Sequence, residues 1–193
     1  TANKEVIAKF GPELLEAAQS YGKSLLFEGS VGAGIPIIGP LTKDLVANQI
    51  HSIHAIINGT TNFILSSMEN QGMTREASLE LAQHLGYAEA DPTNDVDGID
   101  AAYKLAILAT LAFQSRIHPD QIFTEGIGSL DARDFLHAKE LGYSIKLLAI
   151  AKKQVGGIEA RVHPALIPND HMLSKVSGSF NAVAVEGDLA GNT

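Results

Sequence analysis

Three apolar-rich segments follow one another late in the sequence, and they constrain the fold more than any other feature. Apolar side chains alternate over residues 143–151 and again over residues 158–166, and a third strand is expected over residues 180–186. Successive side chains of a strand point to opposite faces, so alternation predicts strands with one face against a core. Adjacent strands of this kind predict a mainly antiparallel sheet.

Helical patterns dominate the rest of the chain. Helices are expected over residues 13–20, 36–45, 60–70, 74–85, 100–113 and 131–141, and two earlier strands over residues 24–27 and 50–57. The segment 100–113 is apolar nearly all round, which predicts a buried helix. The whole pattern predicts an α+β fold over residues 1–193, with a mixed, mainly antiparallel sheet and helices packed on one face.

Composition excludes several classes of function. The 193 residues carry a net charge of -8, which argues against a general binder of nucleic acid or membrane surfaces. The chain has no cysteine, so disulfides, thiolate metal sites and cysteine nucleophiles are excluded, and a reducing, cytoplasmic location is expected. No apolar run approaches the ~20 residues that span a bilayer. Both chain ends are expected to be cuts through a longer polypeptide.

An acid-rich segment before the buried helix is the strongest local signal for chemistry. Five carboxylates lie within residues 89–100, and Lys104 follows. Asp100 and Lys104 are four residues apart on the expected helix, so they share one face. Because the flanking residues are apolar, the pair is either a lysine-containing site or an ordinary surface ion pair. An EF-hand is excluded, since Lys104 would take the last position, where that loop needs an acid.

Two other segments allow more than one interpretation. The glycine-rich turn 29–34 lacks the order G-x-G-x-x-G, and Pro36 removes an amide, so it is a weak dinucleotide signal. It is either a tight packing turn or a cation-binding loop with Glu28 close by. The segment 58–62 is expected at a strand-to-helix junction, either as a plain helix cap or as a group of amides for an anion.

The residues of four segments resemble the homoserine dehydrogenase family. These segments are residues 1–4, 27–38, 58–65 and 88–104, and residues 186–193 also resemble the family. The resemblance implies a protein with an N-terminal Rossmann domain, a catalytic and dimerisation domain and often a regulatory domain. It also implies that residues 1–193 are the catalytic domain, with the nucleotide-binding domain largely absent.

The resemblance implies an activity and roles for particular residues. The reaction would be the reversible reduction of L-aspartate 4-semialdehyde to L-homoserine with NADP or NAD as cofactor. Lys104 would donate the proton, Lys4 would be a second catalytic lysine beside substrate and nicotinamide, and Asp100 would orient Lys104. The substrate-binding residues would be Glu89, Tyr87, Thr60, Asp95 and Gly86. A sodium ion would be held by Glu28, Val31, Ala33 and Ile35.

The resemblance also implies partners. The expected partners are a small-molecule substrate and a second copy of the chain. Neither a nucleic acid nor a membrane is expected as a partner. The alternative is a non-enzymatic dimerisation or small-molecule-binding module.

Overall fold

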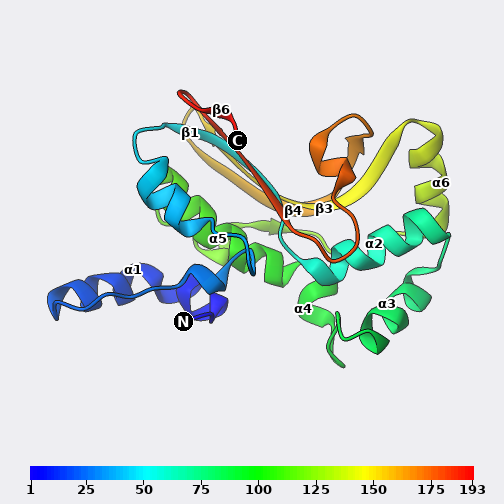
Figure 1. Cartoon of the computed structure of the whole chain (residues 1–193), viewed down its shortest axis with the longest axis horizontal. Coiled ribbons are helices and arrows are strands. Elements are labelled where there is room, and N and C mark those ends of the chain that lie inside the picture. The colour runs from blue at the N-terminus through cyan, green and yellow to red at the C-terminus, as the bar shows by residue number, and fades with distance from the viewer.

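A six-stranded sheet forms one layer of the computed structural model, which describes residues 1–193, and helices pack beneath it (Figure 1). The strands are β1 (Ile50–Ile56), β2 (Phe123–Thr124), β3 (Tyr143–Gln154), β4 (Gly157–Pro168), β5 (Ala182–Gly187) and β6 (Gly191–Asn192). Their order is β2-β4-β3-β1-β5-β6, and only the β2–β4 pair is parallel. The predicted α+β class is therefore confirmed.

Six α-helices accompany the sheet. They are α1 (Lys4–Ser20), α2 (Gly59–Gln71), α3 (Arg75–His84), α4 (Thr93–Val96), α5 (Ile99–Phe113) and α6 (Ala132–Glu140). Helix α5 contacts β1, β3, β4 and α1, so it lies at the centre of the molecule. Leu105 and Leu108 are fully buried there, which confirms the predicted buried helix.

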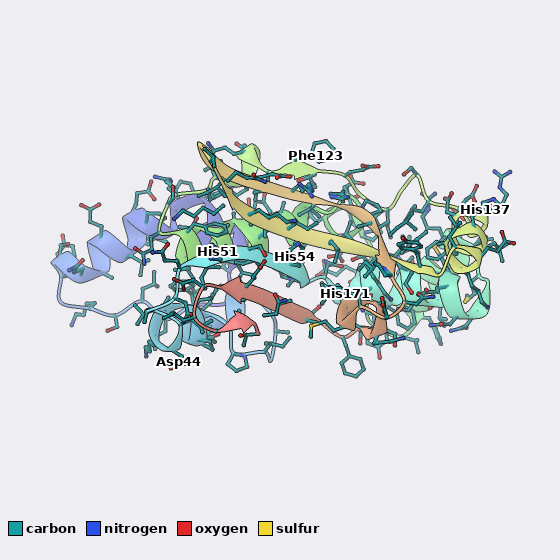
Figure 2. All side chains as sticks on the ribbon, turned by 90° about the horizontal axis from the view of Figure 1, so that it is seen from above. Asp44, His51, His54, Phe123, His137 and His171 are labelled. Carbon is teal, nitrogen blue, oxygen red and sulfur yellow. The ribbon has the colours of Figure 1, made fainter.

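The predicted alternation along β3 is confirmed for the helix-covered face of the sheet. Ile145, Leu147, Ala149 and Ala151 all belong to the main apolar core. The opposite face, seen from above in Figure 2, carries a smaller apolar cluster beneath a 3₁₀ turn (Met172–Lys175). That cluster consists of Ile56, Leu148, Ile150, Ile167 and Leu173. Much of β3 is thus buried on both faces.

Of two predicted elements near the N-terminus, one is wrong and one is shorter than expected. Residues 24–27 form no strand; the chain terminus of Thr1 donates to the Leu26 carbonyl at 2.7 Å, and no strand pairs with this segment. The helix predicted over 36–45 is present over residues 38–44, where a π-helical turn (Pro40–Asp44) follows two α-helical residues. The carboxylate of Glu28 caps the start of this helix, because it accepts from the amides of residues 37–39, which have no acceptor within the first turn.

Three other elements differ in extent or were not predicted. Helix α1 begins at Lys4, not at residue 13, and includes Pro12. The short elements α4 and β2 lie in segments whose sequence shows no clear period.

Residues 124–127 pack against the turn between α4 and α5. Gly98 caps α5 with a positive φ of 79°, and Ile127 donates its amide to the Val96 carbonyl at 2.9 Å. Gly126 lies so close to Val96 and Asp97 that an added Cβ would overlap their backbone. This contact fixes where the acid-rich segment enters α5.

We expect Gly126→Ala to lower the free energy of unfolding by about 1–3 kcal/mol, because the new methyl group displaces rigid backbone. Chemical denaturation measures the change. Gly128→Ala is the matched control, since its Cβ would meet nothing closer than 3.6 Å. Equal stability for the two variants would contradict this packing contact.

Candidate active site

A polar hollow of about 400 Å³ lies where the start of α1 meets the acid-rich segment and the first turns of α5. Its lining residues are Ala2, Asn3, Lys4, Glu5, Glu89, Asp91, Asn94, Asp95, Asp100 and Tyr103. Segments that are far apart in the sequence therefore bring their ionisable groups to one place.

Asp100 is the central carboxylate of this hollow. It is 4% exposed, and its Oδ1 lies 2.9 Å from Lys4 Nζ. Its Oδ2 lies 2.6 Å from Lys104 Nζ and accepts from Asn58 Nδ2 at 2.9 Å. Burial alone would raise the pKa of Asp100, but the charge of Lys104 and the three hydrogen bonds outweigh it and hold the pKa below its ordinary value. Asp100 is therefore an ionised buried carboxylate between two ammonium groups.

Lys104 is held from two sides. Its side chain is 17% exposed, and its Nζ also donates to the Ile57 carbonyl at 2.8 Å. An ammonium carries three N–H groups, so one remains for a ligand. The buried geometry does not match the surface ion pair that the sequence also allowed.

Lys4 reaches Asp100 from the first turn of α1. Asn3 caps that helix by accepting from the Val6 amide at 3.1 Å, and this fixes the direction in which Lys4 leaves the backbone. The hydrogen bond to Asp100 raises the pKa of Lys4 above its ordinary value, against the cost of burial. The side chain is 42% exposed, so Lys4 presents a charged group at the rim.

The residues expected to bind substrate fall into two groups. Glu89 and Asp95 line the hollow itself. Thr60, Tyr87 and Gly86 do not line it, although Thr60 Oγ1 donates to the Tyr87 carbonyl at 2.6 Å and so ties α2 to the start of the acid-rich segment. Gly86 ends α3 with a φ of 78°, and the Tyr87 ring packs 4.9 Å from that of Phe63.

The carboxylate of the glycine-rich turn beside α1 forms its hydrogen bonds within the chain. Glu28 accepts from the amides of Ile37, Ile38 and Gly39 at 2.6–2.9 Å. Burial opposes ionisation, but these amides hold the pKa of Glu28 below its ordinary value. The carbonyls of Val31, Ala33 and Ile35 accept no hydrogen bond, whereas the Glu28 carbonyl meets the Val31 amide at 3.4 Å.

Sequence reasoning missed the roles of two residues, one that binds the acids of the hollow and one that lines it. Asn58 was considered only as a cap or as part of an amide group for an anion, yet its side chain reaches both Asp95 and Asp100. Tyr103 lines the hollow three residues after Asp100, and the helical period could have identified it.

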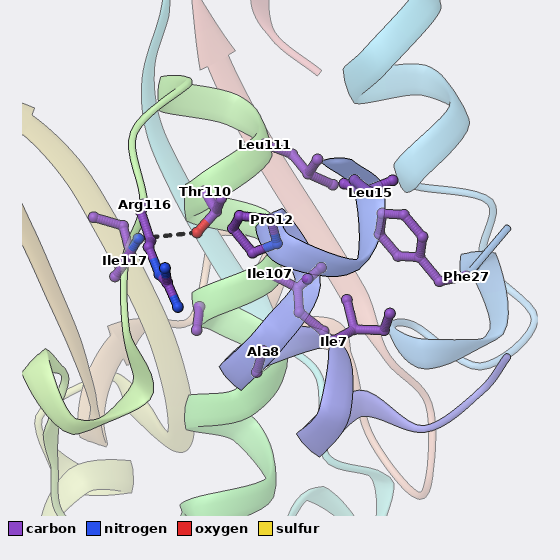
Figure 3. A pocket seen from close by; sticks show the side chains of 12 residues that line it. Ile7, Ala8, Pro12, Leu15, Phe27, Ile107, Thr110, Leu111, Arg116 and Ile117 are labelled. Atoms are coloured by element: carbon purple, nitrogen blue, oxygen red, sulfur yellow. Dashed lines mark hydrogen bonds between the residues drawn. The ribbon is translucent and has the colours of Figure 1, made fainter. Parts of the chain in front are cut away.

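A second, much smaller hollow, of about 40 Å³, lies between α1 and α5 and is mainly apolar (Figure 3). Ile7, Phe27 and Ile107 line it, and its one charged group, Arg116, pairs with Glu13 at 2.6 Å. It gathers no reactive groups, so we assign it to packing between the two helices.

The polar hollow therefore has the features of an acid–base site for an oxygen-containing ligand. A buried ammonium with one free N–H can protonate or stabilise a developing oxyanion, and acidic groups at the rim can hold a cationic end.

Comparison with known proteins gives the family. Residues 36–193 match the family model described as homoserine dehydrogenase. A homoserine dehydrogenase of Synechocystis is 52% identical over 195 residues, covering 99% of this chain and 45% of the relative. One from Pseudomonas aeruginosa is 49% identical, covering 100% and 44%. The chain belongs to the homoserine dehydrogenase family, and it spans about half the length of these curated relatives.

Solved structures agree with this assignment. A homoserine dehydrogenase from Thiobacillus denitrificans superposes with a TM-score of 0.97 at 51% identity, over 100% of this chain and 45% of that one. A hyperthermophilic archaeal homoserine dehydrogenase in complex with NADPH gives a TM-score of 0.84 at 34% identity, over 100% and 55%. The family resemblance seen in the sequence is therefore confirmed. None of the helices has the length and apolar character needed to cross a membrane.

Proposed function

We propose that residues 1–193 are the substrate-binding, catalytic and dimerisation part of a homoserine dehydrogenase. The enzyme would interconvert L-aspartate 4-semialdehyde and L-homoserine in the biosynthesis of threonine, methionine and isoleucine, in the cytoplasm. One observation carries the proposal: the Asp100 carboxylate, which lines the acidic hollow, binds the ammonium groups of Lys4, which also lines it, and of the more buried Lys104. The family membership supports the same conclusion.

Each group has a task in this proposal. Glu89 and Asp95 attract the substrate ammonium, and Lys104 directs its free N–H at the aldehyde oxygen. NADP or NAD, in its reduced form, supplies a hydride to the carbonyl carbon when bound. Lys104 then gives its proton to the nascent alkoxide, while Asp100 fixes the direction of that ammonium. In the reverse direction Lys104 accepts the hydroxyl proton of homoserine.

Lys4 is the residue of this chain that we assign to the cofactor side. Its ammonium is held at the rim by Asp100 and remains 42% exposed, so it can face substrate and nicotinamide together. The archaeal relative described in complex with NADPH supports the use of a nicotinamide cofactor.

We also propose the turn 28–35 as a sodium site. Carbonyl oxygens suit a hard cation, and those of Val31, Ala33 and Ile35 have no hydrogen-bond partner within the chain. The Glu28 carboxylate would not be a ligand, because three amides occupy it; its carbonyl would contribute instead.

Homoserine-dependent reduction of NADP by the full-length protein that contains this chain tests the function. We expect activity with homoserine, and none from residues 1–193 alone, which lack the G-x-G-x-x-G fingerprint. A full-length protein that binds homoserine without oxidising it, with NADP or NAD, would favour the binding-module alternative.

We expect Glu89→Ala to raise the KM for homoserine about tenfold or more while kcat changes less. Its carboxylate faces the substrate ammonium in ground state and transition state alike. Steady-state kinetics measures the split, with Glu80→Ala, at an exposed position on α3, as the control. A selective loss of kcat would contradict this assignment.

We expect the protein to be a homodimer that pairs through the outer sheet face. In the view from above, β3 and β4 run along that face (Figure 2), and an α-helix reaches it only at one end of β3, where Lys146 pairs with Glu69 of α2 at 3.5 Å. Sedimentation equilibrium measures the mass, and a monomer at tens of micromolar would contradict the expectation.

A further inference from the structure

The side-chain amide of Asn58 makes contacts at both of its ends. Asn58 lies between β1 and α2 and is 5% exposed. Its Oδ1 accepts from the Thr61 amide at 2.8 Å and from Thr61 Oγ1 at 2.9 Å. Its Nδ2 donates to Asp95 Oδ1 at 2.6 Å and to Asp100 Oδ2 at 2.9 Å. One side chain thus joins the start of α2 to two acids of the hollow.

Helix capping explains only half of these contacts. A cap needs one acceptor oxygen, which serine, threonine or aspartate supplies equally well. Among these three residues and asparagine, only asparagine has a neutral side-chain group that also supplies two N–H donors. Both donors of Asn58 are used on carboxylates, so the amide end has a role beyond capping.

We infer that Asn58 is a positioning residue that holds Asp95 and Asp100 at a fixed separation by donating to both from one amide. The inference rests on the proposed function. Asp95 lines the hollow where the substrate ammonium would lie, whereas Asp100 holds Lys104, the proton donor. The bridge therefore fixes the distance between the group that binds one end of the substrate and the group that acts on the other.

The neutrality of the amide is essential to this role. Two carboxylates held close together repel one another. The Asn58 amide donates one hydrogen bond to each of them and adds no charge of its own. Asp100 stays negative toward Lys4 and Lys104.

Asn58→Ser is the first test. Serine keeps the cap oxygen but has no donor that reaches both acids, so we expect kcat in the full-length enzyme to fall about 10- to 100-fold, the worth of a hydrogen bond to a charged group. Thr74→Ala is the matched control. Thr74 caps α3 through the Ala77 amide at 3.2 Å and contacts neither acid, so its loss should leave kcat near the parental value.

Asn58→Asp is the second test, and its readout is a pH profile. The new carboxylate would face Asp95 and Asp100, with Lys4, Lys104 and Glu89 nearby. One carboxyl of the three must then keep a proton to replace the lost donor, and its pKa rises. We expect activity that is highest at low pH and is lost as pH rises through that pKa, a loss absent from the parental profile. A merely structural role would lower activity at every pH alike.

The outcomes separate this inference from the proposed function. Absence of homoserine oxidation in the parental enzyme would overturn the function and this inference with it. An active parent whose Asn58→Ser variant keeps kcat, or whose Asn58→Asp variant keeps the parental pH profile, would overturn this inference alone. If Asn58→Ser does not fold, the isosteric Asn58→Asp variant decides.

Discussion

Replacing Lys104 with alanine should lower the kcat of the full-length enzyme by about 10²–10⁴, the usual contribution of a positioned general acid. The Lys104 ammonium is held between Asp100 Oδ2 and the Ile57 carbonyl, and its third N–H is free for the substrate oxygen. The KM for homoserine should change much less, because the interaction strengthens only as charge develops on that oxygen. Steady-state kinetics in both directions measures the two constants.

Arg133→Ala is the control for this variant. Arg133 also pairs with a carboxylate, that of Asp131 at 3.0 Å, but the pair is exposed at the start of α6 and does not line the polar hollow. Removing it should leave kcat near the parental value and change stability by less than about 1 kcal/mol. A folded Lys104→Ala enzyme that behaves like Arg133→Ala would show that Lys104 is only an ion-pair partner.

The elements that sequence alone predicted best are those with a clear period. The alternation over residues 143–151 and 158–166 predicted β3 and β4, and the apolar segment 100–113 predicted α5, because each of these hydropathy patterns lies within its own element. The helices expected over residues 74–85 and 131–141 are also present, as α3 and α6, and Thr74 and Asp131 cap them.

The errors arise where distant contacts override local pattern. Residues 24–27 form no strand, and the Leu26 carbonyl accepts from the chain terminus of Thr1, a contact that nothing in the pattern of this segment indicates. Lys146 is 1% exposed, although the alternation puts it on the face opposite the main core. It lies beyond the residues of β3 that pair with β1, where α2 packs against β3, and burial lowers its pKa.

The candidate site likewise has a part that the local sequence pattern predicted and a part that it did not. The spacing of Asp100 and Lys104 predicted that they share a helix face, and they meet at 2.6 Å. Lys4 and Asn58 join them from 96 and 42 residues away, and the helix period says nothing about such contacts. The family resemblance, not the residue pattern, brought Lys4 into the sequence-based site. Nothing in the sequence predicted that one amide would bridge two acids.

Replacing Asp100 with asparagine should lower the free energy of unfolding of the 193-residue chain by about 3 kcal/mol at neutral pH. The change leaves the Lys104 ammonium largely buried with no negative charge beside it, because the Ile57 carbonyl and the new amide oxygen can accept hydrogen bonds but carry no charge, and an uncompensated buried charge is costly. We take the low end of the free-energy range for removing one partner of a buried ion pair. Lys4 is partly exposed, so its ammonium can turn toward water. Chemical denaturation measures the difference.

Asp131→Asn is the matched control for Asp100→Asn. Asp131 pairs with Arg133 at 3.0 Å in an exposed position, and asparagine also serves as the cap of α6. Its free energy of unfolding should change by less than about 1 kcal/mol. Similar losses for the two variants would contradict the special cost of a buried carboxylate.

The pH dependence gives this prediction a second measurement. The folded pKa of Asp100 lies below its ordinary value, because Lys104 and its other donors outweigh burial. The stability that the carboxylate provides is therefore fully present above its unfolded pKa of about 4 and is lost as pH falls through the folded pKa. The difference between parent and Asp100→Asn should stay constant from neutral pH down to about pH 5 and then shrink toward acid. A difference that grows on acidification would mean that Asp100 carries a proton in the folded protein, and Asp100 would then not be the ionised partner of the two lysines.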